Sequence, residues 1–304
     1  MRKGIKFLLI GTTISIVVVL LFVLLVRGKY KLLYKYVYMS GNETMVRVSY
    51  GKYGFQIKEG FVVLDKSGFK FDSGCSSSYL NPDTLQSFKG FDIIAHINIS
   101  DANGVTKEYP LYYFRKIKTE ENFVIKNMVA YPCNGTVNGL SVLGMDVISA
   151  ANWHFCFKDS CVDVFHVGQT THVPMSAICL SYEQTKNPLI SLTIGEKCFG
   201  HGLLDMGMVD WDICLADSAF SSLLQVCAPE NSIVDTSFSL NSYKLVKTCT
   251  FDSLRIFDSM FANVSVRCGV KNLIGMDFFR RFDHMFWDSG SKKVYLWDDV
   301  EKNL

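Results

Sequence analysis

The chain has 304 residues, of which 49% are hydrophobic and 20% are charged. This composition is typical of a packed globular protein and excludes a disordered chain. Residues 1–36 carry seven Lys or Arg and no acid, so the remainder, with 24 basic and 29 acidic side chains, has a net charge of −5. A mildly acidic body without a basic cluster argues against nucleic acid as a partner.

The first predicted element is a membrane anchor within residues 1–36. Residues 7–26 carry no charge, and as a helix they would rise about 30 Å, enough to cross the hydrocarbon core of a bilayer. The run ends without the small residues of a signal-peptide cleavage site, so we interpret it as retained. Basic residues flank it on both sides, so their count does not set the orientation. We expect a single-pass membrane protein whose soluble body lies outside the cytoplasm.

The cysteines and histidines predict no metal site. Ten cysteines are too few for a disulfide scaffold, and none of them forms a CxxC pair. The six histidines lack the short spacing of metal ligands. We therefore expect no metal and no cofactor. If the body is exported, disulfides become possible, and Cys156 and Cys161 are the nearest candidate pair.

From residue 45 onward the pattern predicts mostly β structure in two similar halves. Short apolar runs at 61–64 and 69–71 are joined by a turn-forming segment, and 189–194 and 198–204 repeat this arrangement. We expect an N-terminal β lobe over residues 45–167, a linker over 168–188 and a C-terminal β lobe over 189–304.

A further hairpin is predicted in the first half. Residues 91–99 and 105–114 are strand-like, and Asn103 and Gly104 lie between them. Asn-Gly favours a tight turn because both residues tolerate positive φ.

Each half contains one Asp-x-Gly signal directly after a strand-like run, beginning at Asp72 and at Asp205. A hydrophobic-Gly-Met-Asp quartet follows each signal, and its glycine, Gly144 or Gly275, lies 72 residues after Asp72 or 70 residues after Asp205. Alone, Asp-x-Gly is compatible with an ordinary turn. The repeated spacing instead predicts a duplicated fold that presents two carboxylates to one site.

Two neighbouring carboxylates can hydrolyse a peptide without a metal. Because they do not easily ionise together, they share one proton, activate water and protonate the leaving group. Gly74 and Gly207 would let the backbone approach closely and supply an N–H to a carboxylate. The hydroxyl of Ser73 would brace the first loop, and strands carrying Gly144 and Gly275 would pass beside the loops.

Residues 71–76, Phe-Asp-Ser-Gly-Cys-Ser, resemble the first active-site loop of pepsin-like and retropepsin-like aspartic proteases. Residues 274–282, 285–288 and 293–296 are similar to the closing segment of the pepsin-like enzymes. The resemblance covers residues 45–298. It implies a bilobal β fold with a cleft between the lobes, Asp72 and Asp205 as the catalytic dyad, and a peptide or protein substrate. The hairpin at Asn103 and Gly104 would be the flap that closes over substrate.

The second loop departs from the family pattern. Met206 replaces the usual Thr or Ser and cannot donate a bracing hydrogen bond. Met208 and Asp210 replace residues that are often small or hydroxylic, and Asp212 follows. Extra carboxylates near a dyad would raise its pKa values.

The sequence therefore leaves two functions open: a membrane-anchored aspartic endopeptidase, or a catalytically inactive peptide- or protein-binding module of the same fold. A third interpretation, an unrelated anchored β-sandwich adhesin, would require the matched spacing to be chance.

Two other features have simpler interpretations. Asp288 begins a third Asp-x-Gly, but it lies between apolar runs at 285–287 and 293–296, so the pattern predicts a hairpin turn. Cys75 follows the first signal without a basic partner nearby in sequence, so we interpret it as a packing residue.

Overall fold

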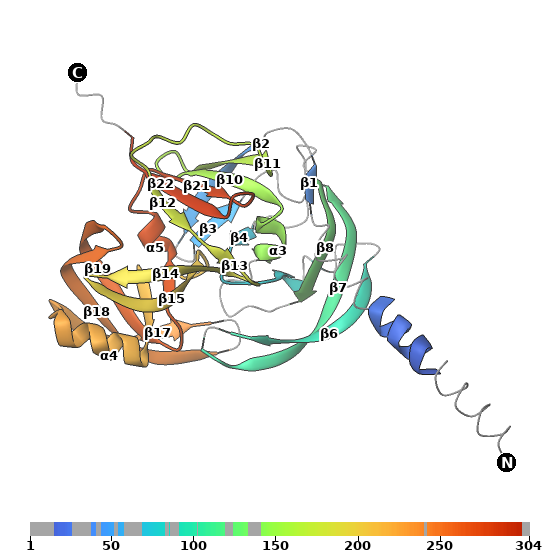
Figure 1. Cartoon of the computed structure of the whole chain (residues 1–304), viewed down its shortest axis with the longest axis horizontal. Helices are drawn as coiled ribbons and strands as arrows, with labels where there is room; N and C mark the ends of the chain where they lie inside the picture. The colour runs from blue at the N-terminus through green and yellow to red at the C-terminus, as the bar shows by residue number, and fades with distance from the viewer. Residues whose placement is uncertain are drawn as a thin grey trace, which may run out of the picture.

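The computed structural model shows a protein built mainly of β-strands (Figure 1), as the sequence predicts. The residues described are 15–25, 38–40, 44–51, 54–57, 69–82, 85, 91–101, 103–118, 124–132, 141–239 and 242–299. The apolar run at 61–64 lies outside these residues, whereas the run at 69–71 forms a strand.

The larger of two sheets has 14 strands among the described residues. In spatial order they are β12 (Ile178–Ser181), β22 (Lys293–Trp297), β21 (His284–Asp288), β10 (Ala151–Cys156), β11 (Cys161–His166), β2 (Thr44–Gly51), β3 (Gly54–Ile57), β4 (Phe69–Phe71), β9 (Ser141–Leu143), β5 (Ser78–Leu80), β8 (Val124–Pro132), β7 (Thr106–Lys118) and β6 (Asp92–Ser100), with β1 (Tyr38–Ser40) paired to β8.

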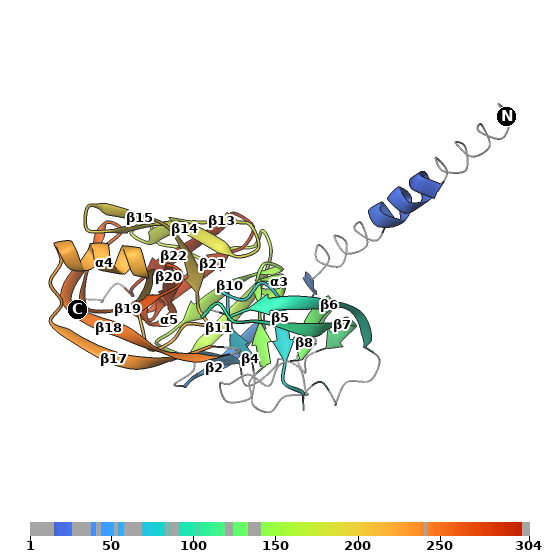
Figure 2. The ribbon, with the colours of Figure 1, turned by 90° about the horizontal axis from the view of Figure 1, so that it is seen from below.

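The second sheet has eight strands in the part of the chain that the structure describes. Their spatial order is β13 (Glu183–Gln184), β14 (Pro188–Ile194), β15 (Lys197–Asp205), β20 (Leu273–Gly275), β16 (Ile213–Ala216), β19 (Ser259–Gly269), β18 (Tyr243–Ile256) and β17 (Asn231–Phe238). Three helices within β-rich segments are α3 (Met145–Ile148), α4 (Asp217–Val226) and α5 (Met276–Phe279). Figures 1 and 2 place α4 at the outer side of this sheet.

The two halves repeat one pattern of strand pairing. In the first half β4 pairs parallel with β9, β9 antiparallel with β5, and β5 parallel with β8. In the second half β15 pairs parallel with β20, β20 antiparallel with β16, and β16 parallel with β19. Asp72 follows β4 directly and Asp205 ends β15. The repeated pairing confirms the duplication that the Asp-to-Gly spacing predicts.

A shared hydrophobic core fixes the strand that precedes the first loop. Phe71 is fully buried, and its ring packs edge-on against Trp153 at 5.1 Å and Phe155 at 5.0 Å between centroids. Such ring pairs contribute about 0.5–1.5 kcal/mol each beyond burial. The same cluster includes Trp287 and Leu204 from the second half. Asp72 therefore follows a residue that is held by both halves of the chain.

The closing hairpin of the chain completes the larger sheet. β21 pairs with β10, which belongs to the first half, and β22 pairs with β12. The buried, alternating side chains of this hairpin, such as Met285, Trp287, Val294 and Leu296, require such a covered position. The predicted linker, residues 168–188, contains both β12 and β13. The division into lobes at 45–167 and 189–304 stays a prediction.

The predicted hairpins at 91–114 and 189–204 are confirmed. β6 pairs with β7, and the turn between them places Gly104 at a φ of +86°. β14 pairs with β15 around Gly195 at a φ of +62°. Both turns use a glycine where other residues would be strained.

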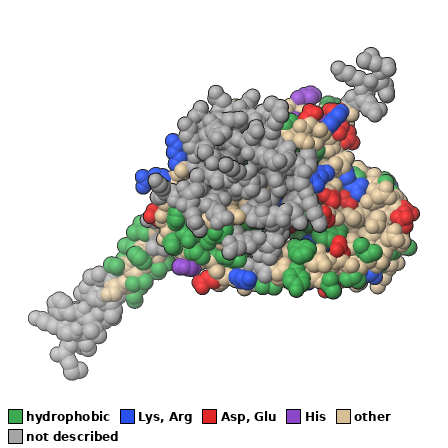
Figure 3. Space-filling model, turned by 180° about the vertical axis from the view of Figure 1, so that it is seen from behind, with side chains coloured by type: hydrophobic (Ala, Val, Ile, Leu, Met, Phe, Trp, Pro, Cys, Tyr) green, Lys and Arg blue, Asp and Glu red, His purple; other side chains and the backbone are tan. Residues whose placement is uncertain are grey.

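The N-terminal region is described over residues 15–25, which form a helix. This helix stands apart from the β-rich body (Figures 1 and 2), and Figure 3 shows hydrophobic side chains exposed along it. Among the described residues, no helix combines the length and apolar character needed to cross a membrane. Of the predicted membrane-spanning run 7–26, residues 7–14 and 26 lie outside the described part of the chain.

Candidate active site

A cavity of about 630 Å³ lies between the two halves of the chain. Asp72 and Asp205 both line it, as do Asp101 near the tip of the β6–β7 hairpin and Phe238 at the end of β17. The topology therefore brings both predicted acids to one cavity, although 133 residues separate them in sequence.

The two carboxylates interact directly and each lies against the loop of the other. The negative charge of Asp72 raises the pKa of Asp205, so the two carboxylates act on each other electrostatically. A Cβ atom added to Gly74 would lie less than 3 Å from the Asp205 carboxylate, and one added to Gly207 would lie as close to the Asp72 carboxylate. Any larger residue at either glycine would displace an acid.

Backbone N–H groups hold each carboxylate. The N–H of Gly207 donates to Oδ1 of Asp205 at 3.0 Å, as the sequence suggests. In the first loop the donor is Cys75, whose N–H lies 3.1 Å from Oδ1 of Asp72. This donor corrects the expectation that Gly74 supplies the bond.

A single hydroxyl joins the two loops. The buried Oγ of Ser73 donates to the carbonyl oxygen of Leu204 at 2.7 Å and accepts from the N–H of Met206 at 3.0 Å. The side chain of Met206 is fully buried in the core and returns no such bond. Asn187, which precedes β14, donates through Nδ2 to the carbonyl of Gly74 at 2.8 Å. The bracing of the loops is therefore asymmetric.

The glycines that follow each loop in the duplicated pattern are enclosed by backbone. A Cβ atom on Gly144 would lie 2.7 Å from the backbone carbon of Ser77. A Cβ atom on Gly275 would collide with the carbonyl oxygen of Trp211. Both strands therefore pass the loops at a distance that only glycine allows.

The β6–β7 hairpin reaches across the cavity to the second half. Nδ2 of Asn103 donates to Oγ of Ser242 at 3.2 Å, and that Oγ donates to Oδ2 of Asp101 at 2.7 Å. Oδ1 of Asp101 accepts from the N–H groups of Asn103 and Val105 at 3.0 and 2.8 Å. Gly104 itself is exposed at the turn. Figure 1 shows this tip near β17 and β18, whose connection carries Ser242.

The environment of Asp205 favours its protonated form. Burial is the main cause that raises the pKa of Asp205 to about 7, and the charge of Asp72 raises it further. Lys70 and Arg267 act in the opposite direction. Nζ of Lys70 donates to the carbonyl oxygen of Gly207 at 2.5 Å, and both cations are buried.

Sequence reasoning missed these two cations. A period of two along β4 places Lys70 and Asp72 on the same face, so a lysine inside that apolar run was an available signal. Arg267 lies 62 residues after Asp205 on β19, and no sequence motif connects them.

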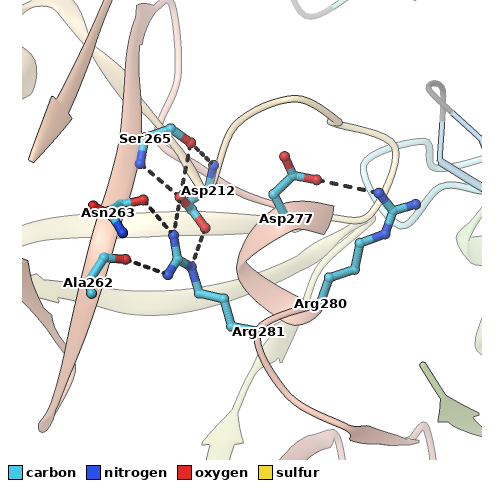
Figure 4. A network of polar contacts seen from close by, with 7 residues as sticks. All are labelled: Asp212, Ala262, Asn263, Ser265, Asp277, Arg280 and Arg281. Carbon is cyan, nitrogen blue, oxygen red and sulfur yellow. Dashed lines mark hydrogen bonds and ion pairs between the residues drawn. The ribbon is translucent and has the colours of Figure 1, made fainter. Parts of the chain in front are cut away.

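Asp212 belongs to a structural ion-pair network rather than to the dyad (Figure 4). Arg281 donates from Nε to Oδ1 of Asp212 at 2.5 Å and from Nη2 to Oδ2 at 2.8 Å. Oγ and the N–H of Ser265 also donate to Asp212. Arg281 therefore offsets the charge of Asp212, and an effect of Asp212 on the dyad stays a prediction. Asp210 does line the cavity.

The remaining candidates have structural roles. Asp288 ends β21, and both its oxygens accept from Ser291, which confirms the predicted hairpin turn. Burial and the charge of Asp72 raise the pKa of Cys75, whose Sγ contacts the hydroxyl of Tyr131 at 3.3 Å. A thiol held in this form is a poor nucleophile.

The structure contains free thiols and no metal cluster in its described part. The nine described cysteines are free, including Cys156 and Cys161, which lie opposite each other on β10 and β11. The candidate disulfide is therefore absent from the described structure. Within the described residues, no group of three or more His, Cys, Asp or Glu side chains could hold a metal ion.

The fold of this chain has a counterpart among solved structures. The crystal structure of the aspartic proteinase from Irpex lacteus matches this chain with a TM-score of 0.56, covering 86% of this chain and 99% of that one. The fold is that of an aspartic proteinase. The two sequences are 10% identical, so the likeness concerns the fold alone. No family model matches the sequence, and a search of curated proteins finds no match.

Proposed function

We propose that this protein is a membrane-anchored aspartic endopeptidase. The observation that carries the proposal is the pair of electrostatically coupled carboxylates, Asp72 and Asp205, each lying against the glycine of the opposite loop in one cavity. Such a pair is suited to sharing one proton. The aspartic-proteinase fold adds the expectation of a peptide or protein substrate.

In the proposed reaction the two acids have different roles. Burial raises the pKa of Asp205 to about 7, so its carboxyl is protonated when the pH is lower than this value. In that form it is suited to donate a proton to the peptide bond. Asp72 would accept a proton from the attacking water. Ser73 would hold the loops in register, while Gly74 and Gly207 allow the close approach of the carboxylates.

A second candidate function is an inactive peptide- or protein-binding module of the same fold. Met206 in place of a hydroxylic residue favours it, because only one side chain braces the two loops. The charges of Lys70 and Arg267 also favour it, since they lower the pKa of Asp205 and so oppose proton sharing.

Cleavage of fluorescein-labelled casein by the full chain in detergent separates the two candidates. The endopeptidase proposal expects cleavage that pepstatin inhibits and that Asp72→Asn and Asp205→Asn each reduce by at least about 1,000-fold. Asp288→Asn, in the third Asp-x-Gly, is the matched control and retains activity. Pepstatin-insensitive cleavage, or cleavage that persists in either dyad variant, would remove the proposed mechanism.

We propose that residues 7–26 hold the protein in the membrane, with the body outside the cytoplasm. The uncharged run and the exposed apolar side chains of residues 15–25 support this. A membrane-impermeant maleimide tests the side, because Cys179 and Cys198 are exposed thiols. Labelling of intact cells that disappears in the double variant Cys179→Ser/Cys198→Ser is expected. Labelling that requires lysis contradicts the proposed orientation.

A further inference from the structure

Arg267 is a buried cation that has no acidic partner. Its side chain lies on β19 and the residue is 6% exposed. Within the described residues, no carboxylate lies within ion-pair distance of it, whereas Arg281 and Arg280 both have such a partner. Its Nε is buried and makes no hydrogen bond to any described residue.

The direct contacts that Arg267 makes include no carboxylate. Nη1 donates to Oγ of Ser237 at 2.5 Å, and the guanidinium lies 4.5 Å from the ring centroid of Trp211. Its charge also acts on the thiol of Cys214, whose pKa it lowers against the larger effect of burial. One hydroxyl and an aromatic face offset only part of the desolvation of a guanidinium. A buried cation in this state favours binding of an anion.

The location of Arg267 connects this charge with the dyad. Arg267, Trp211 and Asp205 line the same cavity, and the charge of Arg267 acts on Asp205. Lys70, the other buried cation of the cavity, differs because its Nζ is bonded to the carbonyl oxygen of Gly207. Arg267 is therefore the buried cation of this cavity with a donor to spare.

We propose that Arg267 binds a carboxylate of the substrate, so that the cleft selects acidic peptides. This inference rests on the proposed function and names its substrate class. A guanidinium suits this role because its planar N–H groups match the two oxygens of a carboxylate. The carboxylate belongs either to an Asp or Glu side chain or to the C-terminus of the peptide.

Paired peptides distinguish these sources. Pools of octapeptides carry either Glu or Gln at one fixed position, and each pool is prepared with a free or an amidated C-terminus. In one of these two kinds of pair, Glu against Gln or free against amidated C-terminus, we expect the wild-type chain to cleave the acidic peptide with a kcat/KM about 10- to 100-fold higher than its neutral counterpart. A Glu/Gln difference assigns the side chain as the source, and an acid/amide difference assigns the C-terminus. Equal rates in every pair overturn the inference while leaving the endopeptidase intact.

Variants test whether Arg267 is responsible. Arg267→Met should bring the preferred ratio close to 1, and Arg267→Lys should retain part of it. Arg255→Met is the matched control, because Arg255 is exposed on β18 of the same sheet and is absent from the cavity lining. A preference that survives Arg267→Met overturns the inference. If circular dichroism shows that Arg267→Met does not fold, Arg267→Lys provides the test. An acidic-to-neutral kcat/KM ratio in Arg267→Lys equal to that of the wild type overturns the inference.

Binding separates this inference from the proposed function. Fluorescence anisotropy of labelled peptides is measured with the Asp72→Asn variant, which the proposed mechanism makes inactive. Tighter binding of the acidic peptide, lost in Asp72→Asn/Arg267→Met, supports the inference even if the wild type cleaves nothing. Absence of any acid-dependent binding or cleavage overturns it.

Discussion

The hydroxyl of Ser73 lies between the two active-site loops and makes hydrogen bonds to both neighbours of Asp205. Ser73→Ala would leave the carbonyl of Leu204 and the N–H of Met206 without their partner in a buried site. We expect the free energy of unfolding to fall by about 1–3 kcal/mol, measured by urea denaturation. The exposed Ser253 on β18 offers a control, and Ser253→Ala should change stability by less than about 0.5 kcal/mol. Equal effects of the two changes contradict this account.

Asp146 makes stability depend on pH. Burial raises its pKa from 3.8 to about 7, and its Oδ1 accepts from the N–H and Oγ of Ser78. Between these pH values the folded protein holds a proton that the unfolded chain has lost. The protonated Asp146 therefore contributes to the free energy of unfolding below pH 3.8. This contribution, at most about 4 kcal/mol, is lost as the pH rises to about 7. Asp146→Asn should flatten this fall in chemical denaturation, and an unchanged slope argues against a buried neutral acid.

Lys70 should set the alkaline limit of the proposed activity. Its charge lowers the pKa of Asp205, against the larger effect of burial. Lys70→Met removes that charge, so the pKa of Asp205 should rise and the alkaline limb of the profile of kcat/KM against pH should move to higher pH. Lys186→Met, a change of an exposed lysine, is the control and should leave the limb in place. A limb that moves to lower pH with Lys70→Met reverses the assigned sign.

At the scale of elements, the β6–β7 hairpin is tied to the second half by Ser242. Ser242→Ala removes the bonds to Asn103 and Asp101. We expect faster amide hydrogen exchange over β6 and β7, because the tip then loses its contacts across the cavity. Exchange in β14 and β15 of the same variant gives an internal reference and should not change. Unaltered protection of β6 and β7 shows that this contact does not hold the hairpin.

Local patterns predicted the elements whose partners are close in sequence. The β6–β7 and β14–β15 hairpins follow from apolar runs around turn residues, and both loops follow from Asp-x-Gly after a strand. Pairings between strands that are far apart in the chain have no comparable local pattern in the sequence. β21 joins β10 about 130 residues away, and the apolar alternation of His284–Asp288 does not specify which strand it meets.

The same limit applies to the site. Asp72 and Asp205 were accessible because each repeats one motif at a matched spacing. Arg267 reaches the dyad only through the folding of β19, and Asn187 reaches the first loop from a segment that was predicted to be a linker. In the sequence, Asp212 is an aspartate near Asp205 and looks like another candidate acid. Its ion-pair partner Arg281 lies 69 residues further along the chain, so the sequence does not reveal the pair. Composition and spacing therefore did not separate structural from reactive acids.

At the scale of the whole molecule, one hydrophobic cluster spans both halves, so the cleft is formed by parts that fold together. Phe71 from the first half and Trp287 from the closing hairpin pack with their ring centroids 6.4 Å apart. The position of Asp72 relative to Asp205 thus depends on residues from both ends of the chain. This arrangement favours a dyad of fixed geometry rather than two independent carboxylates.

The central claim is that these two carboxylates act as one unit. Its most direct test is kcat/KM for casein cleavage by Asp72→Asn, Asp205→Asn and the double variant. If the acids share one proton, either single change removes nearly all activity, and the double variant is about as active as each single one. Losses that multiply in the double variant, or an active single variant, would show that the two acids work separately and would contradict the account.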